Sequence, residues 1–106
     1  MRQLKNIHPG EVLKEEFLDP MDISVYRLSK DTGLSQTRLG QLVKGKRGVT
    51  AETAVKLGKF FGIAPEFWMN LQSLYDIEEA QKQYRKDLKS IHSIQTLITF
   101  RLSRSK

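Results

Sequence analysis

The chain has 106 residues, no cysteine and a formal net charge of +6. This length suits one small domain with a short tail, and the lack of cysteine excludes disulfides and thiolate zinc sites. No segment approaches the roughly 20 apolar residues that span a bilayer, and the N-terminus lacks the apolar run of a secretory signal. We therefore expect a cytoplasmic protein with no membrane association.

The charges are distributed unevenly along the chain. Residues 24–62 carry eight basic and two acidic side chains, whereas residues 63–81 carry four acidic side chains and no basic one. Residues 82–106 are again basic, with seven basic side chains and one acidic. A basic block in a small domain favours a polyanionic partner such as nucleic acid, although a merely solvated basic surface has the same composition.

The first predicted helix begins at Pro9, because proline suits the first position of a helix. Its buried face consists of apolar residues at helical spacing, namely Val12, Leu13, Phe17 and Leu18. Pro20 is expected to end this helix near Asp19. Met21 and Ile23 would then be buried between this helix and the elements that follow.

Residues 24–45 predict two short helices joined by a tight turn, which is the pattern of a helix-turn-helix. Ser24 and Ser35 are in position to cap the first and the second helix through their hydroxyl groups. Gly33 suits the left-handed residue that ends the first helix, and apolar Leu34 follows it as a buried hinge. The inner face of the second helix carries Leu39, Leu42 and Val43.

The outer face of the second helix carries side chains that suit the reading of DNA bases. Glutamine pairs with adenine, arginine pairs with guanine, and the threonine methyl group contacts thymine. We predict base contacts for Gln36, Thr37, Arg38 and Gln41. We predict phosphate contacts for Ser24, Ser35, Lys44, Lys46 and Arg47. An ordinary helical hairpin is the alternative, but this face has no acidic side chain.

The next predicted helix is capped by Thr50 and runs to about Phe61. Gly58 lies inside it, where glycine costs about 1 kcal/mol relative to alanine. We interpret this glycine as a sign of close packing, and a simply tolerated glycine is the alternative.

A strongly apolar segment follows Pro65. In one interpretation Phe67, Leu71 and Leu74 close the core of the domain. In the other, part of the segment extends onto a partner surface, because large aromatic side chains are enriched at interfaces. For this dimer or partner interface we predict Trp68, Met69, Leu71 and Tyr75.

The last part of the chain predicts a long basic helix. Asp76 and Glu79 have the spacing of a capping box that would start it. A narrow apolar stripe runs along it, formed by Ile77, Ala80, Tyr84, Leu88 and Ile91, and this stripe is a second candidate for the dimer interface. The segment from residue 91 onward fits a helix or a strand. We divide the chain into a DNA-binding domain, 1–81, and a basic C-terminal extension, 82–106.

The sequence lacks the residue patterns of catalysis and of metal binding. His8 and His92 do not have the spacing of metal ligands, and there is no glycine-rich phosphate-binding loop. No nucleophile and base can be paired. We therefore expect no enzyme activity, no cofactor and no metal.

Four segments resemble the HigA/VapI antitoxins, which belong to the Cro/phage-repressor-type helix-turn-helix group: HPGEVLKEEFLDP, TGLS, GKRGVTAETAVKLGKFFG and PEFWMNLQSLYDIEEA. The resemblance covers about residues 7–81. It implies an all-α, five-helix domain that acts as a homodimer on double-stranded operator DNA. It also implies a small HigB/RelE-like, mRNA-cleaving toxin as partner, which the chain would neutralise while repressing the shared operon.

The resemblance also bears on single positions of the helix-turn-helix. Gln36, Thr37, Arg38 and Gln41 match the base-facing positions of the family. Ser29 stands where the family has a small alanine, and its hydroxyl needs a partner, such as a carbonyl one turn back. Gly40 stands where a longer polar residue is common, so it weakens the helix and lets the backbone approach DNA.

Two other functions fit the same sequence. A stand-alone transcriptional regulator without a toxin partner would use identical DNA chemistry. A helical adaptor would bind a protein through its aromatic segment, and its basic face would only be solvated.

Overall fold

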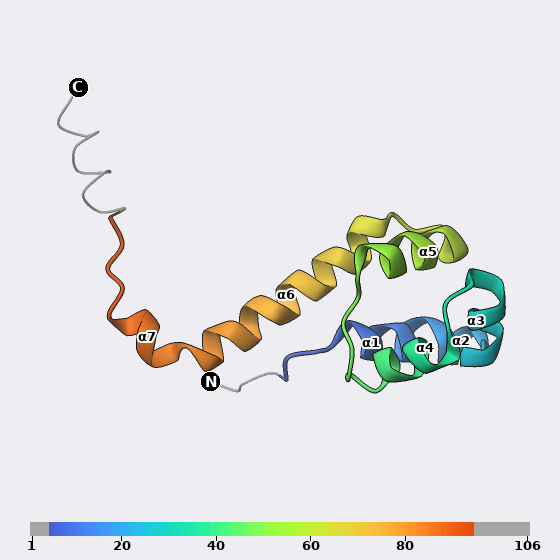
Figure 1. Cartoon of the computed structure of the whole chain (residues 1–106), viewed down its shortest axis with the longest axis horizontal. Helices are drawn as coiled ribbons and strands as arrows, with labels where there is room; N and C mark the ends of the chain where they lie inside the picture. Colours follow the sequence, from blue (N-terminus) through green and yellow to red (C-terminus); the bar gives the residue numbers. More distant parts are fainter. Residues whose placement is uncertain (1–4, 95–106) are drawn as a thin grey trace, which may run out of the picture.

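The structure, a computed structural model, describes residues 5–94 and is all-helical within this range (Figure 1). Its elements in chain order are α1 (Pro9–Val12), the π-helical turn η1 (Leu13–Leu18), α2 (Asp19–Met21), α3 (Val25–Thr32), α4 (Gln36–Val43), α5 (Ala51–Phe61), α6 (Pro65–Gln83) and α7 (Arg85–Lys89). The first three form one continuous helix, so the described part contains the expected five-helix domain and a helical extension. The expected all-α class is confirmed. None of the helices described is long and apolar enough to cross a membrane.

The first helix continues past Pro20, so the prediction that it ends near Asp19 is wrong. In an α-helix the proline ring would clash with the carbonyl four residues back. Here the Asp19 amide instead bonds to the Lys14 carbonyl, five residues back, and this wider π turn leaves room for the ring. The helix ends at Met21, where Asp22 takes the left-handed conformation with a φ of 55°.

The prediction that Met21 and Ile23 are both buried is only half right. Ile23 is partly buried against the core, whereas Met21 is 52% exposed. Met21 lies in the last turn of the first helix, on the side that faces solvent, because the extra residue of the π turn shifts the later positions around the helix axis.

The α3–α4 unit forms as the sequence predicts. The Ser24 hydroxyl accepts a hydrogen bond from the Arg27 amide (3.0 Å), and the Ser35 hydroxyl accepts one from the Arg38 amide (3.0 Å). Gly33 has a φ of 80° and ends α3. These caps lie within three residues of the helix ends they satisfy, so local sequence determines them.

The turn between α3 and α4 is held by two side-chain hydroxyls. Ser29 donates to the Leu34 carbonyl (2.5 Å), across the turn and not to a carbonyl one turn back. Thr32 takes that role, because it donates to the Leu28 carbonyl (2.6 Å) and accepts from the Leu34 amide (3.2 Å). The serine in place of alanine therefore adds a bond that helps to fix the angle between the two helices.

Trp68 lies at the centre of the core, and the prediction that it extends onto a partner surface is wrong. Its side chain is fully buried, and its ring lies 5.1 Å from that of Phe17. The buried core consists of Leu13, Leu18, Leu28, Leu34, Leu39, Leu42, Val49, Ala54, Leu57 and Trp68. Leu74, expected in the core, is 66% exposed. The inward face of α6 is thus rotated by one residue, about 100°, from the face that periodicity suggested.

Two glycines allow close contacts that a side chain would prevent. A Cβ atom on Gly58 would lie 2.5 Å from the Ile63 carbonyl oxygen, so close packing at Gly58 is confirmed, with the loop after α5 as its neighbour. A Cβ atom on Gly10 would lie 1.7 Å from the Leu42 carbonyl oxygen. The first helix therefore rests directly on the backbone at the end of α4.

The long helix α6 runs without a break past Asp76, so the prediction of a capping box at that position is wrong. Asp76 accepts a hydrogen bond from the Gln72 amide group (2.9 Å), and the Gln72 side-chain oxygen accepts from the Val49 amide (2.6 Å). In Figure 1, α6 leaves the body of the domain and leads to α7. Residues 91–94 are neither helix nor strand, and the rest of the ambiguous C-terminal segment lies outside the described residues.

Candidate nucleic-acid interface

The outward side of α4 forms a shallow hollow at the protein surface. It is lined by Gln36, Thr37, Gly40, Gln41, Lys44 and Lys46. Three of the four predicted base-reading residues therefore lie beside two of the predicted phosphate-binding lysines. Gln36 and Thr37 are exposed, and no hydrogen bond or ion pair to another described residue occupies the Lys44 or Lys46 ammonium group. The hollow thus offers amide and ammonium donors on one face.

The end of α4 brings the lysines back toward this face. Gly45 has a φ of 75°, the Gly45 amide bonds to the Leu42 carbonyl (3.0 Å), and the Lys46 amide bonds to the Gln41 carbonyl (2.8 Å). This pair of bonds is a Schellman motif, which reverses the chain directly after a helix. Lys46 therefore lies beside α4 although it follows the helix in sequence.

Gln41 is held in place by a basic neighbour. The Arg47 Nε donates to the Gln41 side-chain oxygen (3.0 Å). That oxygen retains a second lone pair, and the amide nitrogen retains two donors. Gln41 can therefore still pair with a base while Arg47 limits its rotation.

Arg38 lies apart from the hollow, against the start of α5. Its Nη1 donates to Oε1 of Glu52 (3.0 Å), and about one third of its side chain is exposed, 32%. Glu52 also accepts from the Lys56 ammonium group through its other oxygen (2.8 Å). The hydrogen bond from Lys56, followed by the one from Arg38, lowers the pKa of the Glu52 carboxyl.

Sequence reasoning missed Glu52, although the chain held a signal for it. Glu52 is the only acidic residue between Asp31 and Glu66. A single acid inside a long basic stretch indicates a specific basic partner. The structure shows that this partner includes a predicted base-reading side chain.

Ser24 and Ser35 lie at the N-termini of α3 and α4, and both are exposed. A helix N-terminus presents unpaired amide groups and a partial positive charge, which favours phosphate. Their capping role is compatible with a phosphate contact, because the hydroxyl hydrogen of each serine is not used in the cap. Of the five predicted phosphate-binding residues, Lys44 and Lys46 line the hollow itself, whereas the two serines lie at the starts of α3 and α4.

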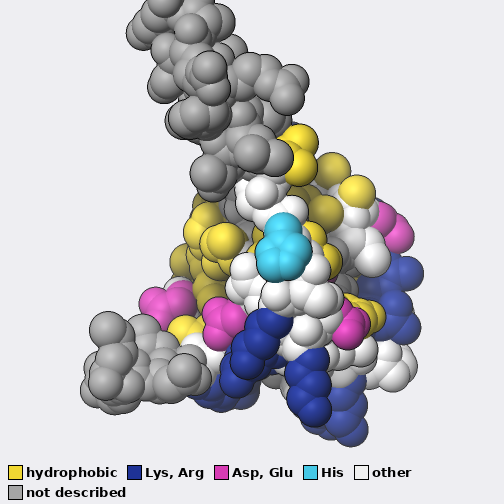
Figure 2. Space-filling view, turned by 90° about the vertical axis from the view of Figure 1, so that its left-hand side faces the viewer, with side chains coloured by type: hydrophobic (Ala, Val, Ile, Leu, Met, Phe, Trp, Pro, Cys, Tyr) yellow, Lys and Arg dark blue, Asp and Glu magenta, His cyan; other side chains and the backbone are white. Residues whose placement is uncertain are grey.

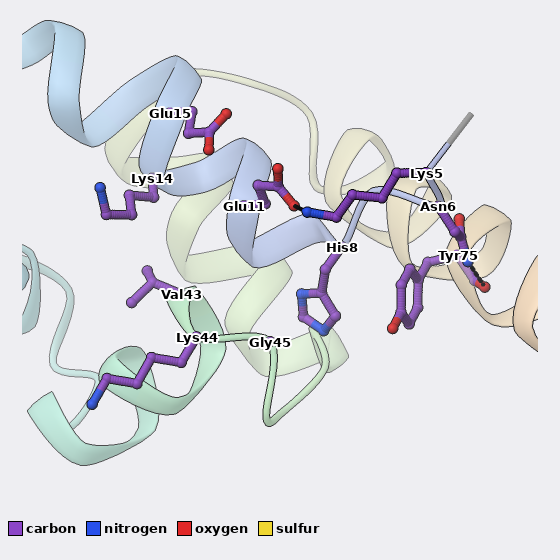
Figure 3. A pocket seen from close by; sticks show the side chains of 10 residues that line it. All are labelled: Lys5, Asn6, His8, Glu11, Lys14, Glu15, Val43, Lys44, Gly45 and Tyr75. Carbon is purple, nitrogen blue, oxygen red and sulfur yellow. Dashed lines mark hydrogen bonds and ion pairs between the residues drawn. The ribbon is translucent and has the colours of Figure 1, made fainter. Parts of the chain in front are cut away.

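A second hollow lies on the other side of the end of α4 (Figure 3). It is lined by Lys5, Asn6, His8, Glu11, Lys14, Glu15, Val43, Lys44, Gly45 and Tyr75. The His8 Nδ1 accepts a hydrogen bond from the Gly10 amide (2.9 Å) and so caps the first helix. Its ring lies edge-on to Tyr75, with 4.8 Å between the ring centroids.

Burial of the ring lowers the pKa of His8, although Asp76 and Glu11 act in the opposite direction. The cap also needs the neutral ring, because a protonated Nδ1 cannot accept the Gly10 bond. Within residues 5–94 no group of three acidic, histidine or cysteine side chains could hold a metal ion. His8 is therefore a structural residue that joins the first helix to α6.

The apolar strip, defined as Ile77, Ala80, Tyr84, Leu88 and Ile91, forms a groove along the end of α6 and α7. Its large side chains are between 46% and 67% exposed. Figure 2 views this end of the molecule and shows exposed hydrophobic side chains next to a group of Lys and Arg side chains. An exposed apolar surface of this kind on a small domain indicates an interaction surface.

Comparison with known proteins gives consistent matches. The family model described as Helix-turn-helix matches residues 13–68, which include the α3–α4 unit. Virulence-associated protein I of Dichelobacter nodosus is 39% identical over 97 residues, which cover 92% of this chain and 86% of that protein. Antitoxin HigA-1 of Vibrio cholerae is 36% identical over 94 residues, which cover 86% of this chain and 88% of the antitoxin.

A solved structure of Pseudomonas aeruginosa antitoxin HigA with the higBA promoter has the same fold. It superimposes with a TM-score of 0.81 at 36% sequence identity, and the match covers 85% of this chain and 99% of the other. The similarity thus extends through α6 as well as the α3–α4 unit.

Proposed function

Since the chain belongs to the helix-turn-helix family and to its HigA-type antitoxins, we propose that it binds the operator of its own operon through α4 and represses transcription. The observation that carries this proposal is the hollow on α4, which combines base-reading amide groups with unpaired lysines. Proteins of this family are DNA-binding regulators rather than enzymes. We also propose a cytoplasmic location, because a repressor must reach its operator DNA there.

The proposed contacts divide into two groups. Gln36, Thr37, Arg38 and Gln41 read base edges in the major groove. Ser24, Ser35, Lys44, Lys46 and Arg47 bind phosphates on either side of that groove and fix the register of α4. Repression follows from occlusion, because a protein seated in the promoter excludes the polymerase.

A homodimer would place two α4 helices in successive major grooves, about 34 Å apart. We propose the apolar strip as the surface that joins the two chains. Of the two candidate surfaces, the segment around Trp68 is largely used by the core, whereas the strip is open. Asp76 and Glu79 flank Ile77 at the start of the strip, and Arg85 and Lys86 lie beyond Tyr84 in its second half. A two-fold antiparallel arrangement would therefore set the acidic part of one chain against the basic part of the other.

The toxin partner is a small HigB/RelE-like protein that cleaves mRNA, and the chain neutralises it by binding. Family membership supports this part of the proposal. Met69, Leu71 and Tyr75 stay predicted interface residues, because each is only partly buried. A stand-alone regulator is the alternative, and the neighbouring reading frame distinguishes the two: a small basic ribonuclease-like gene beside this one favours the antitoxin.

The test is a titration of the purified chain against its own promoter fragment and a scrambled duplex of equal length, at two salt concentrations. We expect a preference for the promoter that survives the higher salt, because base contacts release no counterions. Gln36→Ala should reduce this preference. Lys46→Ala should lower the affinity for both duplexes to the same degree and flatten the salt dependence of binding.

Equal and salt-sensitive binding to both duplexes would refute the repressor function. The basic block would then supply only charge, as the adaptor alternative requires. Loss of affinity for both duplexes to the same degree in Gln36→Ala would instead show that the base-reading assignment on α4 is wrong.

A further inference from the structure

We propose that Glu52 is a positioning residue that fixes Arg38 for base reading and so determines specificity at one base pair of the operator. This inference rests on the proposed function, because it needs α4 to read DNA. It concerns a residue on α5 that makes no predicted contact with DNA itself.

The geometry ties Arg38 to α5 through one nitrogen only. Nη1 of Arg38 lies 3.0 Å from Oε1 of Glu52. An arginine side chain has five N–H donors in a planar group, so this bond leaves donors for the paired acceptors of a guanine. Arg38 lies in the first turn of α4 and Glu52 in the first turn of α5. The ion pair thus joins the ends of two helices that are fixed by the core.

Lys56 makes this acid compatible with DNA. A carboxylate near the phosphate backbone would repel it, but Lys56 binds the second oxygen of Glu52 (2.8 Å) from one turn further along α5. Both oxygens of Glu52 are therefore occupied by basic side chains. The three side chains together carry a net positive charge, and the hydrogen bonds from Lys56 and Arg38 lower the pKa of the acid.

Positioning matters because an arginine side chain has many rotamers. An unrestrained arginine loses rotational freedom when it pairs with a base, and a held arginine loses less. A held guanidinium group also presents its donors in one direction, so a base pair with different acceptors is rejected more strongly. In the opposite role, called a latch here, the ion pair with Glu52 would keep Arg38 from contacting DNA. The two roles predict opposite effects on promoter binding when the charge of Glu52 is removed.

The experiment uses the full chain and the variant Glu52→Gln, which keeps the size of the side chain and removes its charge. Affinities are measured for the promoter fragment, for duplexes with one base pair changed at a time, and for random DNA. Arg38→Ala identifies the base pair that Arg38 reads. Glu16→Gln is the matched control, because Glu16 is an exposed acid that has no ion pair with another described residue.

We expect Glu52→Gln to lower discrimination at the base pair of Arg38 by at least threefold and to leave other positions unchanged. Affinity for random DNA should stay equal or rise, since one negative charge is lost. Glu16→Gln should leave the discrimination intact. A merely structural role of Glu52 would instead weaken binding to all duplexes together.

Besides this uniform weakening of binding, three results would overturn the inference. Discrimination that survives Glu52→Gln shows that Arg38 needs no positioning, and a gain in affinity for the promoter alone shows a latch. If Arg38→Ala changes the preference at no base pair, Arg38 does not read a base. If the wild-type chain itself shows no base preference, the proposed function is refuted. Failure of the proposed function is thereby distinguished from failure of the Glu52 inference.

Discussion

Gly40 offers a substitution whose effects on stability and on DNA binding should have opposite signs. It lies inside α4 (Gln36–Val43), and a Cβ atom built on it meets no other atom within 4 Å. Glycine inside a helix costs about 0.5–1 kcal/mol relative to alanine, chiefly because it loses more backbone freedom on folding. Gly40→Ala should therefore stabilise the domain by about that amount, which raises Tm by roughly 2–8 °C for a domain of this size.

The same methyl group would enter the hollow that Gly40 shares with Gln36 and Lys44. If bases or sugars occupy that hollow, the added group keeps the backbone of α4 away from DNA. We therefore expect Gly40→Ala to weaken binding to the promoter fragment by about tenfold, which corresponds to about 1.4 kcal/mol. The assays are thermal unfolding followed by circular dichroism and a DNA titration at fixed salt.

Gly58→Ala is the matched control for the stability half of this prediction. It is also a helical glycine, but its Cβ would lie 2.5 Å from the Ile63 carbonyl oxygen, so the same change should lower Tm. A lower Tm for Gly40→Ala would show that the space around Gly40 has been misjudged. A higher Tm with unchanged promoter affinity would show that the hollow on α4 does not face DNA.

Three further predictions concern the rest of the fold. The pKa of His8 is lower in the folded state than in the unfolded state, so the neutral ring stabilises the fold. This stabilisation is present above the unfolded pKa of about 6.5 and is lost as the pH falls through the folded pKa. Urea unfolding between pH 7.5 and about 5 should show this decline, and His8→Asn, which keeps a capping side chain, should flatten it. Trp68→Ala should cost about 3–5 kcal/mol because it removes the centre of the core, and an unchanged urea midpoint would contradict its placement. Ile77→Ser with Leu88→Ser should shift the sedimentation coefficient toward that of a monomer, whereas Leu74→Ser, at an even more exposed leucine outside the apolar strip, should not.

The features that the sequence predicted correctly are those whose causes lie close together in the chain. Ser24 and Ser35 cap helices whose first amides are three residues away, and Gly33 ends α3 because of its own backbone freedom. The outward face of α4 was also predicted, since the inward residues Leu39 and Leu42 leave only one side for polar groups. The hollow on α4 therefore contains three of the four side chains that were predicted to read bases, and their contacts with DNA stay predictions.

One feature that the sequence did not predict, the inward face of α6, depends on segments far apart in the chain. Six apolar or aromatic side chains among the nine positions 67–75 of α6 allow several inward faces, and the ring of Phe17 against Trp68 selects one of them. The path of the first helix past Pro20 depends on a π turn, for which the residues carry no clear signal.

By itself, the sequence determined the all-helical class, the α3–α4 unit and the polar character of the outer face of α4, because helix caps and apolar periodicity act over a few residues. Only the tertiary structure decided that Trp68 belongs to the core, that the apolar strip stays open, and that Glu52 holds Arg38. Those outcomes depend on how helices are rotated against one another, and the rotation is set by packing among residues that are distant in sequence.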